Sequence, residues 1–251
     1  MKRFGLIGHP IGHSLSPLLF REAYAGRMSY DLIQTPSFDE AMERFVSAYD
    51  AVNVTAPFKE MAFRASDEAD PYASRLEAAN ILVRTNGRIK AYNTDCPGVV
   101  MVLRQMQLRA GCDVLVVGCG GAGRAAALAA LTLGCKVSIA NRDFAKAERF
   151  AARTGAVPLK LGDIANNGSK TIIYTLPTDI EFPGTLFFGG KAVLEANYRD
   201  PFLEKQCTQQ GGFYIPGTRW LAAQAICGFK VMTGLEPDGH LIERCLNLNN
   251  L

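Results

Sequence analysis

A glycine turn between an apolar strand and an alanine-rich helix constrains the fold of this 251-residue chain more than any other feature. Residues 113–143 read DVLVVGCGGAGRAAALAALTLGCKVSIANRD, in which Gly118, Gly120 and Gly123 form a G-x-G-x-x-G pattern. Strand, glycine turn, helix and second strand in this order are typical of a mononucleotide-binding half of a Rossmann-like domain. The first glycine permits a sharp turn, the second lets backbone amides approach a pyrophosphate, and the third brings helix and strand together. We therefore predict a bound dinucleotide, the alternative being a packing turn without a ligand.

The residues after the second strand bear on which dinucleotide binds. That strand ends at Asn141, Arg142 and Asp143, and Lys146 follows one helical turn later. An acidic residue here accepts hydrogen bonds from the ribose of NAD, whereas an arginine binds the additional phosphate of NADP. Arg142 and Lys146 favour NADP, whereas Asp143 would repel that phosphate, so NAD stays possible. The alternative is that all three charges are solvated at a helix start.

The first hundred residues alternate apolar, β-rich runs with helical stretches. The runs are RFGLIG, YDLIQT and AVNVTA, and helices are expected from about Pro17, near 38–49 and from Lys59 onward. This order predicts a mostly parallel sheet that is covered on both faces. Asn86-Gly87 lies between two further β-like runs and predicts an antiparallel hairpin.

A change of pattern near residue 99 divides the chain into two predicted domains. Residues 99–219 are expected to form the NADP-binding Rossmann-like domain, whose sheet continues through TIIYTL, KAVLEANY and GGFYIPG. Residues 220–251 are mostly helical and have no sheet of their own. We therefore expect them to fold onto residues 1–98 and complete a substrate-binding catalytic domain. The predicted fold class is α/β, with a cleft between the two domains.

Charge and composition exclude several classes of function. The chain has 27 basic and 24 acidic residues and no basic run that could follow a phosphate backbone, so we expect no nucleic acid partner. No stretch of about 18 apolar residues is present, and the apolar run at the N-terminus is too short for a signal peptide. We therefore expect a cytoplasmic protein without a membrane partner, either a monomer or a homodimer.

The cysteines and histidines do not form a metal-binding or disulfide pattern. The seven cysteines are odd in number and contain no C-x-x-C pair, which predicts reduced and mostly buried thiols. The three histidines, His9, His13 and His240, lack metal-ligand spacing. We therefore expect no metal site.

Three polar loops follow strands of the first predicted domain. They are GHPIGHSLSP after the first strand, NVTAPFK after the third and YNTD after the hairpin. In open parallel sheets, ligands bind outside the carboxyl ends of the strands, so the three loops predict a substrate site. Ser14 and Ser16 precede Pro17, where a serine hydroxyl can either cap a helix or face a ligand.

A lysine and an aspartate in these loops are candidates for proton transfer. Asn53 and Thr55 alternate along the third strand and share one face, and Lys59 follows in the next turn. Partial burial lowers the pKa of a lysine and suits it to exchange a proton near neutral pH. Asp95 supplies the counter-charge. An isolated pair of this kind is often a surface salt bridge, but hydroxyl and amide neighbours favour a catalytic pair.

These segments resemble the shikimate dehydrogenase family over nearly the whole chain. GHPIGHSLSP is similar to the family's N-terminal serine motif, NVTAPFK to its Asn-Val-Thr-x-Pro-x-Lys signature, and AANIL followed by YNTD to its Ala-Val-Asn-Thr and Asn-Thr-Asp segments. The glycine turn, NRD and WLAAQA match family segments in the same order.

The resemblance implies roles for individual residues. Lys59 and Asp95 would form the catalytic pair. The hydroxyls and carboxylate of the substrate would be held by Ser14, Ser16, Thr55, Asn80, Tyr198 and Gln224. The residues expected to contact the dinucleotide are Gly118, Gly120, Gly121, Ala122, Gly123, Asn141, Arg142, Lys146 and Gly217.

The chain also departs from the family pattern. Asp143 replaces a threonine, Glu195 replaces an aspartate, Trp220 replaces a methionine, and YTLPTD at residues 174–179 replaces an Asn-Ala-Thr segment. These changes leave the cofactor preference and the contacts near the nicotinamide open.

The resemblance implies reversible, NADPH-dependent reduction of 3-dehydroshikimate to shikimate in aromatic amino acid biosynthesis. One alternative is a quinate/shikimate dehydrogenase that uses NAD or NADP. Another, from a different class, is a protein that binds NADP or a ligand without turnover. The intact Lys59 and Asp95 favour an enzyme.

Overall fold

Two compact units make up the protein, which is represented by a computed structural model describing residues 2–177 and 186–248. The first unit spans Met1–Gly98 and Ala222–Leu251, and the second spans Val99–Leu221. Each unit contains a six-stranded sheet. Within the described residues, no helix has the length and apolarity needed to cross a membrane.

The sheet of the first unit is mixed, with strand order β2-β1-β3-β5-β6-β4. Its strands are β1 (Arg3–Gly8), β2 (Ser29–Gln34), β3 (Ala51–Val54), β4 (Glu68–Ala69), β5 (Ile81–Thr85) and β6 (Arg88–Tyr92). β1 pairs in parallel with β2 and β3, whereas β5 is antiparallel to both β3 and β6. The predicted hairpin is confirmed: Asn86 and Gly87 have φ values of 51° and 78°, as its tight turn requires.

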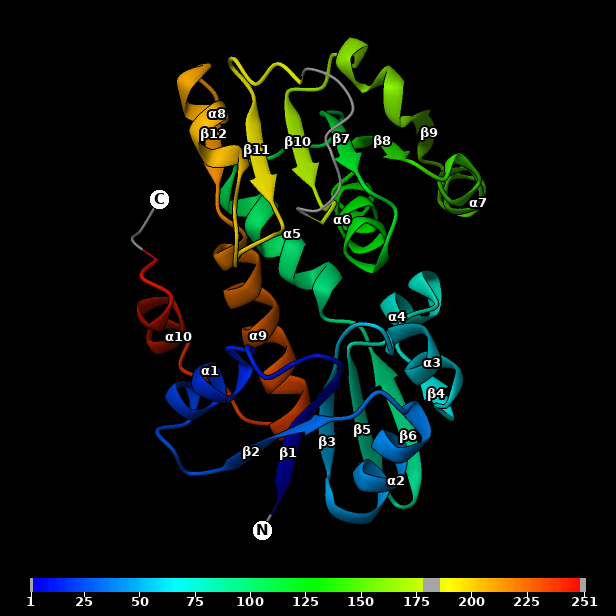
Figure 1. Ribbon diagram of the computed structural model, residues 1–251, viewed down its shortest axis with the longest axis vertical. Helices are drawn as coiled ribbons and strands as arrows, with labels where there is room; N and C mark the ends of the chain where they lie inside the picture. Colours follow the sequence, from blue (N-terminus) through cyan, green and yellow to red (C-terminus); the bar gives the residue numbers. More distant parts are fainter. Residues whose placement is uncertain (1, 178–185, 249–251) are drawn as a thin grey trace. The chain divides into compact units, whose positions relative to one another are not determined.

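Helices cover both faces of this sheet. They are α1 (Ser16–Ala23), α2 (Phe38–Ala48), α3 (Lys59–Arg64), α4 (Pro71–Leu76) and α10 (Gly239–Cys245), together with much of α9 (Gly217–Thr233). Figure 1 shows α2, α3 and α4 on one side of the sheet and α1, α9 and α10 on the other. Successive β1 residues point to opposite faces. Ile7 joins the cluster with Phe45 of α2, whereas the Phe4 ring lies 5.3 Å from that of Phe20 on α1.

The sheet of the second unit is entirely parallel, in the order β12-β11-β10-β7-β8-β9. Its strands are β7 (Asp113–Val117), β8 (Lys136–Asn141), β9 (Val157–Lys160), β10 (Thr171–Tyr174), β11 (Ala192–Glu195) and β12 (Phe213–Ile215). Buried parallel strands read as continuous apolar runs, and DVLVV and TIIY follow this rule. The sequence pattern missed β9, an edge strand that contains Pro158.

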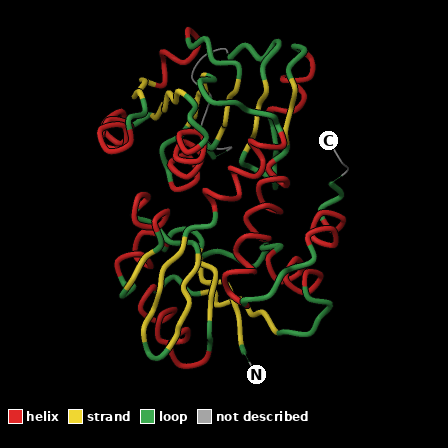
Figure 2. The backbone as a smooth tube through the Cα atoms, turned by 180° about the vertical axis from the view of Figure 1, so that it is seen from behind, coloured by secondary structure: helices red, strands yellow, loops and turns green. Residues whose placement is uncertain are grey.

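Figure 2 shows helices on both sides of the second sheet. They are α5 (Asp95–Gln105), which begins in the first unit, α6 (Gly121–Thr132), α7 (Phe144–Thr154), the 3-10 helix η1 (Leu161–Asn166) and α8 (Leu203–Gln209). Alanines at 125–127 and 129–130 are buried in α6, and their small side chains let this helix lie close to the sheet. The prediction of an α/β fold with mostly parallel sheets is confirmed.

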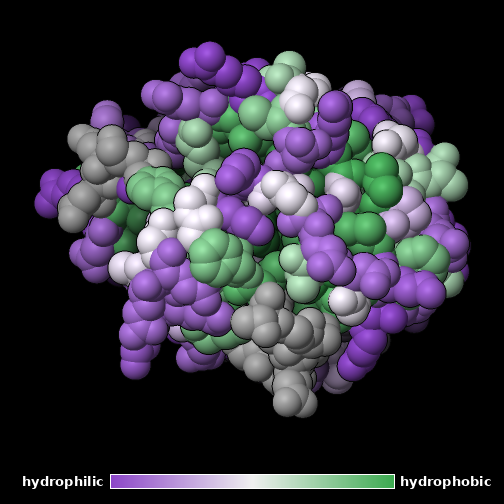
Figure 3. Space-filling model, turned by 90° about the horizontal axis from the view of Figure 1, so that it is seen from above, coloured by the Kyte–Doolittle hydropathy of each residue, from purple (hydrophilic) through white to green (hydrophobic). Residues whose placement is uncertain are grey.

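A few large apolar side chains of the second unit are exposed, among them Phe187 and Phe213. Figure 3 shows hydrophobic residues lying among hydrophilic ones on the face seen from above. Single exposed apolar residues of this kind are normal on protein surfaces.

A buried carboxylate joins three segments of the second unit. Glu195, the last residue of β11, has no exposed surface, and its two oxygens accept the N–H groups of Phe202 (3.1 Å) and Leu203 (3.2 Å) and the hydroxyl of Tyr214 (2.8 Å). Helix α8 begins at Leu203, and its N-cap residue has no side chain that caps the helix. The Glu195 carboxylate caps the helix instead, because it accepts these N–H groups. Burial and the neighbouring Glu195 raise the pKa of Tyr214, which keeps its hydroxyl a donor.

We predict that Glu195→Gln lowers the free energy of unfolding by about 1–3 kcal/mol, because one acceptor oxygen becomes an amide that cannot accept from these donors. Thermal unfolding monitored by circular dichroism measures the change. Glu204→Gln, an exposed position on α8, serves as the control and should change stability by less than about 0.5 kcal/mol. Equal melting temperatures for the two variants would contradict the prediction.

Candidate active site

The three polar loops meet because of the strand directions in the first unit. β1, β3 and β6 run the same way, since β5 is antiparallel to both β3 and β6. Their carboxyl ends therefore lie at one edge of the sheet, where β5 begins directly after Asn80. The first two loops are hydrogen-bonded: Thr55 N donates to Ile7 O (2.9 Å) and His9 N donates to Ala56 O (3.2 Å). Gly8 is required here, because a Cβ atom at this position would lie 2.4 Å from Cγ2 of Thr55.

The two serines share a hydrogen bond at the start of α1. Ser14 Oγ donates to Ser16 Oγ and accepts the N–H of Ser16, both at 3.2 Å. The N-cap residue of α1 is Leu15, which has no capping side chain. Ser14 therefore satisfies a backbone donor near the helix start, whereas the Ser16 hydroxyl does not cap the helix. The preceding loop is held by Gln34, whose Oε1 accepts Ile11 N at 2.9 Å.

Lys59 and Asp95 form a short ion pair. Lys59 Nζ lies 2.5 Å from Oδ2 of Asp95, and Asn80 Nδ2 donates to the other carboxylate oxygen at 3.0 Å. The Lys59 side chain is 24% exposed and that of Asp95 only 11%, so the pair is not a solvated surface salt bridge. Asp95 is also the first residue of α5, where the positive end of the helix dipole favours a carboxylate.

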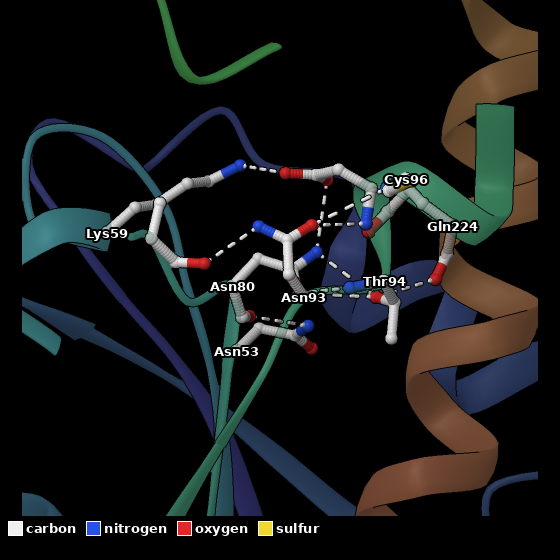
Figure 4. Close-up of polar contacts among 9 residues, drawn as sticks. Asn53, Lys59, Asn80, Asn93, Thr94, Cys96 and Gln224 are labelled. Carbon is white, nitrogen blue, oxygen red and sulfur yellow. Dashed lines mark hydrogen bonds and ion pairs between the residues drawn. The ribbon is translucent and has the colours of Figure 1, made fainter. Parts of the chain in front are cut away.

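Asparagine side chains hold this region together. Asn80 Oδ1 accepts Thr94 N at 2.8 Å, and Asn93 Oδ1 accepts Asp95 N at 3.1 Å. Figure 4 shows the polar ends of Lys59, Asn80, Asn93 and Thr94 turned toward one another. Asn93 was not among the predicted site residues. Its position two residues before the start of a helix is typical of a capping asparagine and could have identified it.

Gln224 and Tyr198 lie in different units. Gln224 of α9 belongs to the first unit, where its carbonyl accepts the Thr94 hydroxyl at 3.4 Å. Gly98 of α5 packs against it so closely that a Cβ atom would lie 2.8 Å from Gln224 N. Tyr198 belongs to the second unit, and burial raises its pKa against the opposing effect of Arg199. Its approach to the substrate stays a prediction.

The glycine turn of the second unit fits a pyrophosphate. Gly118 has a φ of +107°, and a Cβ on Gly123 would lie only 2.0 Å from Gly118 O, so both positions require glycine. Gly120 is different, because a Cβ there would meet nothing within 4 Å. It is the N-cap residue of α6, and Gly121 and Ala122 form the partly exposed first turn. Backbone amides at such a helix start can bind phosphate oxygens.

The Asn141 side chain connects this turn to α7. Its Oδ1 accepts Cys119 N at 3.1 Å, and its Nδ2 donates to Asp143 O at 3.0 Å. Arg142, Asp143 and Lys146 are exposed, so both cations are accessible to a phosphate group. The Cys119 thiol is buried, which raises its pKa, and it lies 3.6 Å from Lys146 O. This packing favours a structural role of Cys119 over that of a reactive thiol.

Two further positions of the second unit are held by close contacts. Gly217 begins α9, and a Cβ there would lie 2.6 Å from Glu195 O, so close packing alone accounts for this glycine. Thr175 was not predicted, yet its hydroxyl donates to Val117 O at 3.0 Å and lies against both Gly118 and Gly123. Thr178 and Asp179, which belong to the atypical YTLPTD segment, lie outside the described residues.

All seven cysteines lie in the described part of the chain, and none of them forms a disulfide. Over residues 2–177 and 186–248, no group of three or more histidine, cysteine, aspartate or glutamate side chains could hold a metal ion.

Comparison with known proteins gives consistent matches. A family model described as the shikimate dehydrogenase substrate binding domain matches residues 6–82. A shikimate dehydrogenase (NADP(+)) from Carboxydothermus hydrogenoformans is 30% identical, with 99% of this chain and 97% of that protein covered. One from Thermus thermophilus is 32% identical over 95% of each chain.

The chain belongs to the shikimate dehydrogenase family.

A solved structure of the family agrees with this assignment. Shikimate 5-dehydrogenase from Thermus thermophilus, in complex with NADP(H) and shikimate, superposes with a TM-score of 0.88 at 30% identity, covering 98% of this chain and 99% of that one. The predicted family is therefore confirmed.

The departures from the family pattern can now be located. Trp220 is 6% exposed and Glu195 is completely buried, so both are packing residues of the second unit. Asp143 is the exposed N-cap residue of α7, and its side chain makes no capping hydrogen bond. Asp143 therefore differs from the buried Glu195 and Trp220, because its carboxylate is accessible to a ligand.

We predict that alanine at two glycines of the turn affects different properties, namely stability at Gly123 and NADP binding at Gly120. Gly123→Ala forces a Cβ against Gly118 O and should lower the free energy of unfolding by about 1–3 kcal/mol or more. Gly120→Ala places its Cβ in open space and should cost less than about 1 kcal/mol, but it should weaken NADP binding because the methyl group blocks close approach of the pyrophosphate. Melting temperatures and NADP titrations of both variants test this, and unchanged NADP affinity in Gly120→Ala would contradict it.

Proposed function

We propose that this protein is an NADP-dependent shikimate dehydrogenase that reversibly reduces 3-dehydroshikimate to shikimate in aromatic amino acid biosynthesis. The observation that carries the proposal is the Lys59–Asp95 ion pair, which is held by Asn80 at the edge of the sheet where the three polar loops meet. Its chemistry agrees with the activity named for relatives that match almost the full chain.

Lys59 moves the proton in the proposed reaction. The dinucleotide supplies the hydride, so the protein must position the substrate ring and manage one proton. In the reduction, the Lys59 ammonium donates a proton to the oxygen of the former carbonyl, and in the oxidation the neutral amine accepts it. Asp95 orients the amine through its Oδ2 atom, while Asn80 fixes the carboxylate through Oδ1.

The remaining residues of the first unit hold the substrate. Ser14 and Ser16 offer uncharged hydroxyl donors to the substrate carboxylate. A carboxylate bound by these hydroxyls does not compete with Asp95 for Lys59. Thr55, Asn80 and Gln224 are assigned to the ring hydroxyls. Tyr198 of the second unit is retained as a candidate substrate contact.

The second unit holds NADP. The open backbone at Gly120 and the start of α6 at Gly121 and Ala122 bind the pyrophosphate, while Gly118 and Gly123 give the turn its shape. Asn141 keeps the turn and α7 together, and the exposed Arg142 and Lys146 bind the 2'-phosphate. Gly217 lies in the same unit and is retained as a candidate contact.

The reaction is tested by initial rates with shikimate and with quinate, each in the presence of NADP and of NAD. We expect the highest kcat/KM for shikimate with NADP. A higher kcat/KM for quinate or with NAD would support the dual-specificity alternative, which the comparisons do not favour. Absence of turnover in all four mixtures would support the alternative of a protein that only binds its ligands.

We also propose that the enzyme works in the cytoplasm, which the seven cysteines without disulfides support because reducing compartments keep thiols reduced. The absence of a nucleic acid partner and the choice between monomer and homodimer stay predictions.

We predict that Lys59→Ala lowers kcat for shikimate oxidation by roughly 10²–10⁴-fold, because the general base is lost. NADP affinity should stay the same, since the cofactor residues lie in the other unit. Steady-state kinetics and an NADP titration measure the two effects. Lys230→Ala, an exposed lysine of α9 that pairs with Glu236, is the control and should keep wild-type kcat. Wild-type turnover in Lys59→Ala would exclude the proposed role.

We predict that Asp143→Asn increases the preference for NADP over NAD. The substitution removes a negative charge beside the proposed 2'-phosphate site, and one such repulsion at the surface is worth about 1 kcal/mol, or roughly fivefold. The ratio of kcat/KM for NADP to that for NAD measures the effect. Asp163→Asn, at an exposed position of η1, should leave the ratio unchanged. An unaltered ratio in Asp143→Asn would mean that the carboxylate does not face the phosphate.

A further inference from the structure

A tyrosine of β2 contacts a polar side chain beside the proposed substrate site. The Tyr30 hydroxyl donates to Asn53 Oδ1 at 2.7 Å. β2 carries none of the three polar loops, so no sequence pattern connects Tyr30 with the site.

We propose that Tyr30 is a positioning residue for substrate binding, whose hydroxyl fixes the Asn53 amide next to Asn80. The inference deepens the proposed function and rests on it.

Tyr30 is connected to the catalytic pair through Asn53 and Asn80. The Tyr30 hydroxyl donates to Asn53 Oδ1. Asn53 Nδ2 then donates to Asn80 O at 3.4 Å (Figure 4), and the Asn80 side chain donates to Asp95. Without the Tyr30 hydroxyl, Asn53 Oδ1 would lose this donor.

Aromatic packing holds the Tyr30 ring. The ring centroid lies 4.8 Å from that of Phe20 on α1 and 6.1 Å from that of Phe229 on α9. Both neighbouring rings are almost completely buried. Burial raises the pKa of Tyr30 above its ordinary value, against the opposing effect of Ser16, so the phenol keeps its proton and stays a donor.

The direction of each hydrogen bond explains why the phenol matters. A hydroxyl has one proton, so Ser14 and Ser16 must redirect theirs when they bind a substrate carboxylate. The Tyr30 proton need not move, because it is directed to Asn53 and away from the serines. Tyr30 therefore keeps Asn53 Oδ1 engaged and the amide N–H group turned toward Asn80 in both states. An amide that lost this donor would be free to rotate.

Tyr30→Phe tests the proposal, because it removes only the hydroxyl and preserves the ring. We expect KM for shikimate to rise about five- to thirtyfold, with a smaller change in kcat and an unchanged KM for NADP. Steady-state kinetics with each substrate varied separately give these values.

Tyr24→Phe provides a matched control. Tyr24 also packs against Phe20, at 5.0 Å between centroids, and its hydroxyl lies 2.8 Å from the Thr233 hydroxyl. This variant loses a hydrogen bond of the same kind from the same aromatic cluster, yet neither Thr233 nor Tyr24 belongs to the proposed site. We expect a comparable loss of thermal stability and a wild-type KM for shikimate.

A double-mutant cycle shows whether Tyr30 acts through Asn53. Asn53→Ala should raise KM for shikimate, and adding Tyr30→Phe to it should raise KM by less than Tyr30→Phe does alone. Fully multiplicative effects would contradict the assigned connection.

The outcomes separate this proposal from the function on which it rests. A wild-type protein that does not oxidise shikimate would overturn the proposed function and this inference together. An active wild type with an unchanged KM in Tyr30→Phe, or with equal KM increases in Tyr24→Phe and Tyr30→Phe, would overturn only the role of Tyr30. Loss of the cooperative thermal transition in Tyr30→Phe would also overturn it, because the hydroxyl would then be needed for folding.

Discussion

The ion pair between Lys59 and Asp95 is the interaction on which the organisation of the first unit depends. It joins the start of α3 to the start of α5, two helices that follow strands of the same direction. A carboxylate with this little exposure needs a donor for each oxygen, and Lys59 and Asn80 supply one each. The loops must therefore meet at this position in the folded protein. The same requirement places a lysine amine next to the substrate hydroxyl in the proposed reaction.

The sequence predicted the features that depend on local patterns. The glycine turn, the parallel sheets and the Asn86-Gly87 hairpin follow from glycine positions and apolar runs, and the structure contains all of them. It did not predict β4 or β9. β4 has only two residues, and β9 contains Pro158 and two residues of intermediate burial between exposed ends, so neither has a clear periodic pattern. Both exist because a neighbouring strand offers unpaired backbone groups, which is a tertiary effect.

The residues of the candidate site also fall into two groups, those that the sequence could identify and those that only the structure shows. Lys59 and Asp95 could be proposed from the residues, since charged and polar side chains after buried strands need partners. Tyr30 could not, because a tyrosine in YDLIQT is typical of any half-buried strand. Its significance depends on Asn53, which is 23 positions away along the chain and becomes a neighbour only through the pairing of β1 with β2 and β3. A contact of this kind requires the register of the sheet.

The proposed sites of the two units use different groups to bind a ligand. In the second unit, Gly118 and Gly123 pack so closely that nothing but glycine fits there, and the proposed ligand contacts are backbone amides at the start of α6. In the first unit, the proposed contacts are partly buried hydroxyls and buried amides of side chains, and each needs a partner that determines its direction. A backbone amide has its direction fixed by the helix, whereas a serine hydroxyl or an asparagine amide can rotate. The hydrogen bonds of Tyr30 and Asn53 belong to the first unit, where the proposed ligand contacts are side chains that must be held in one orientation.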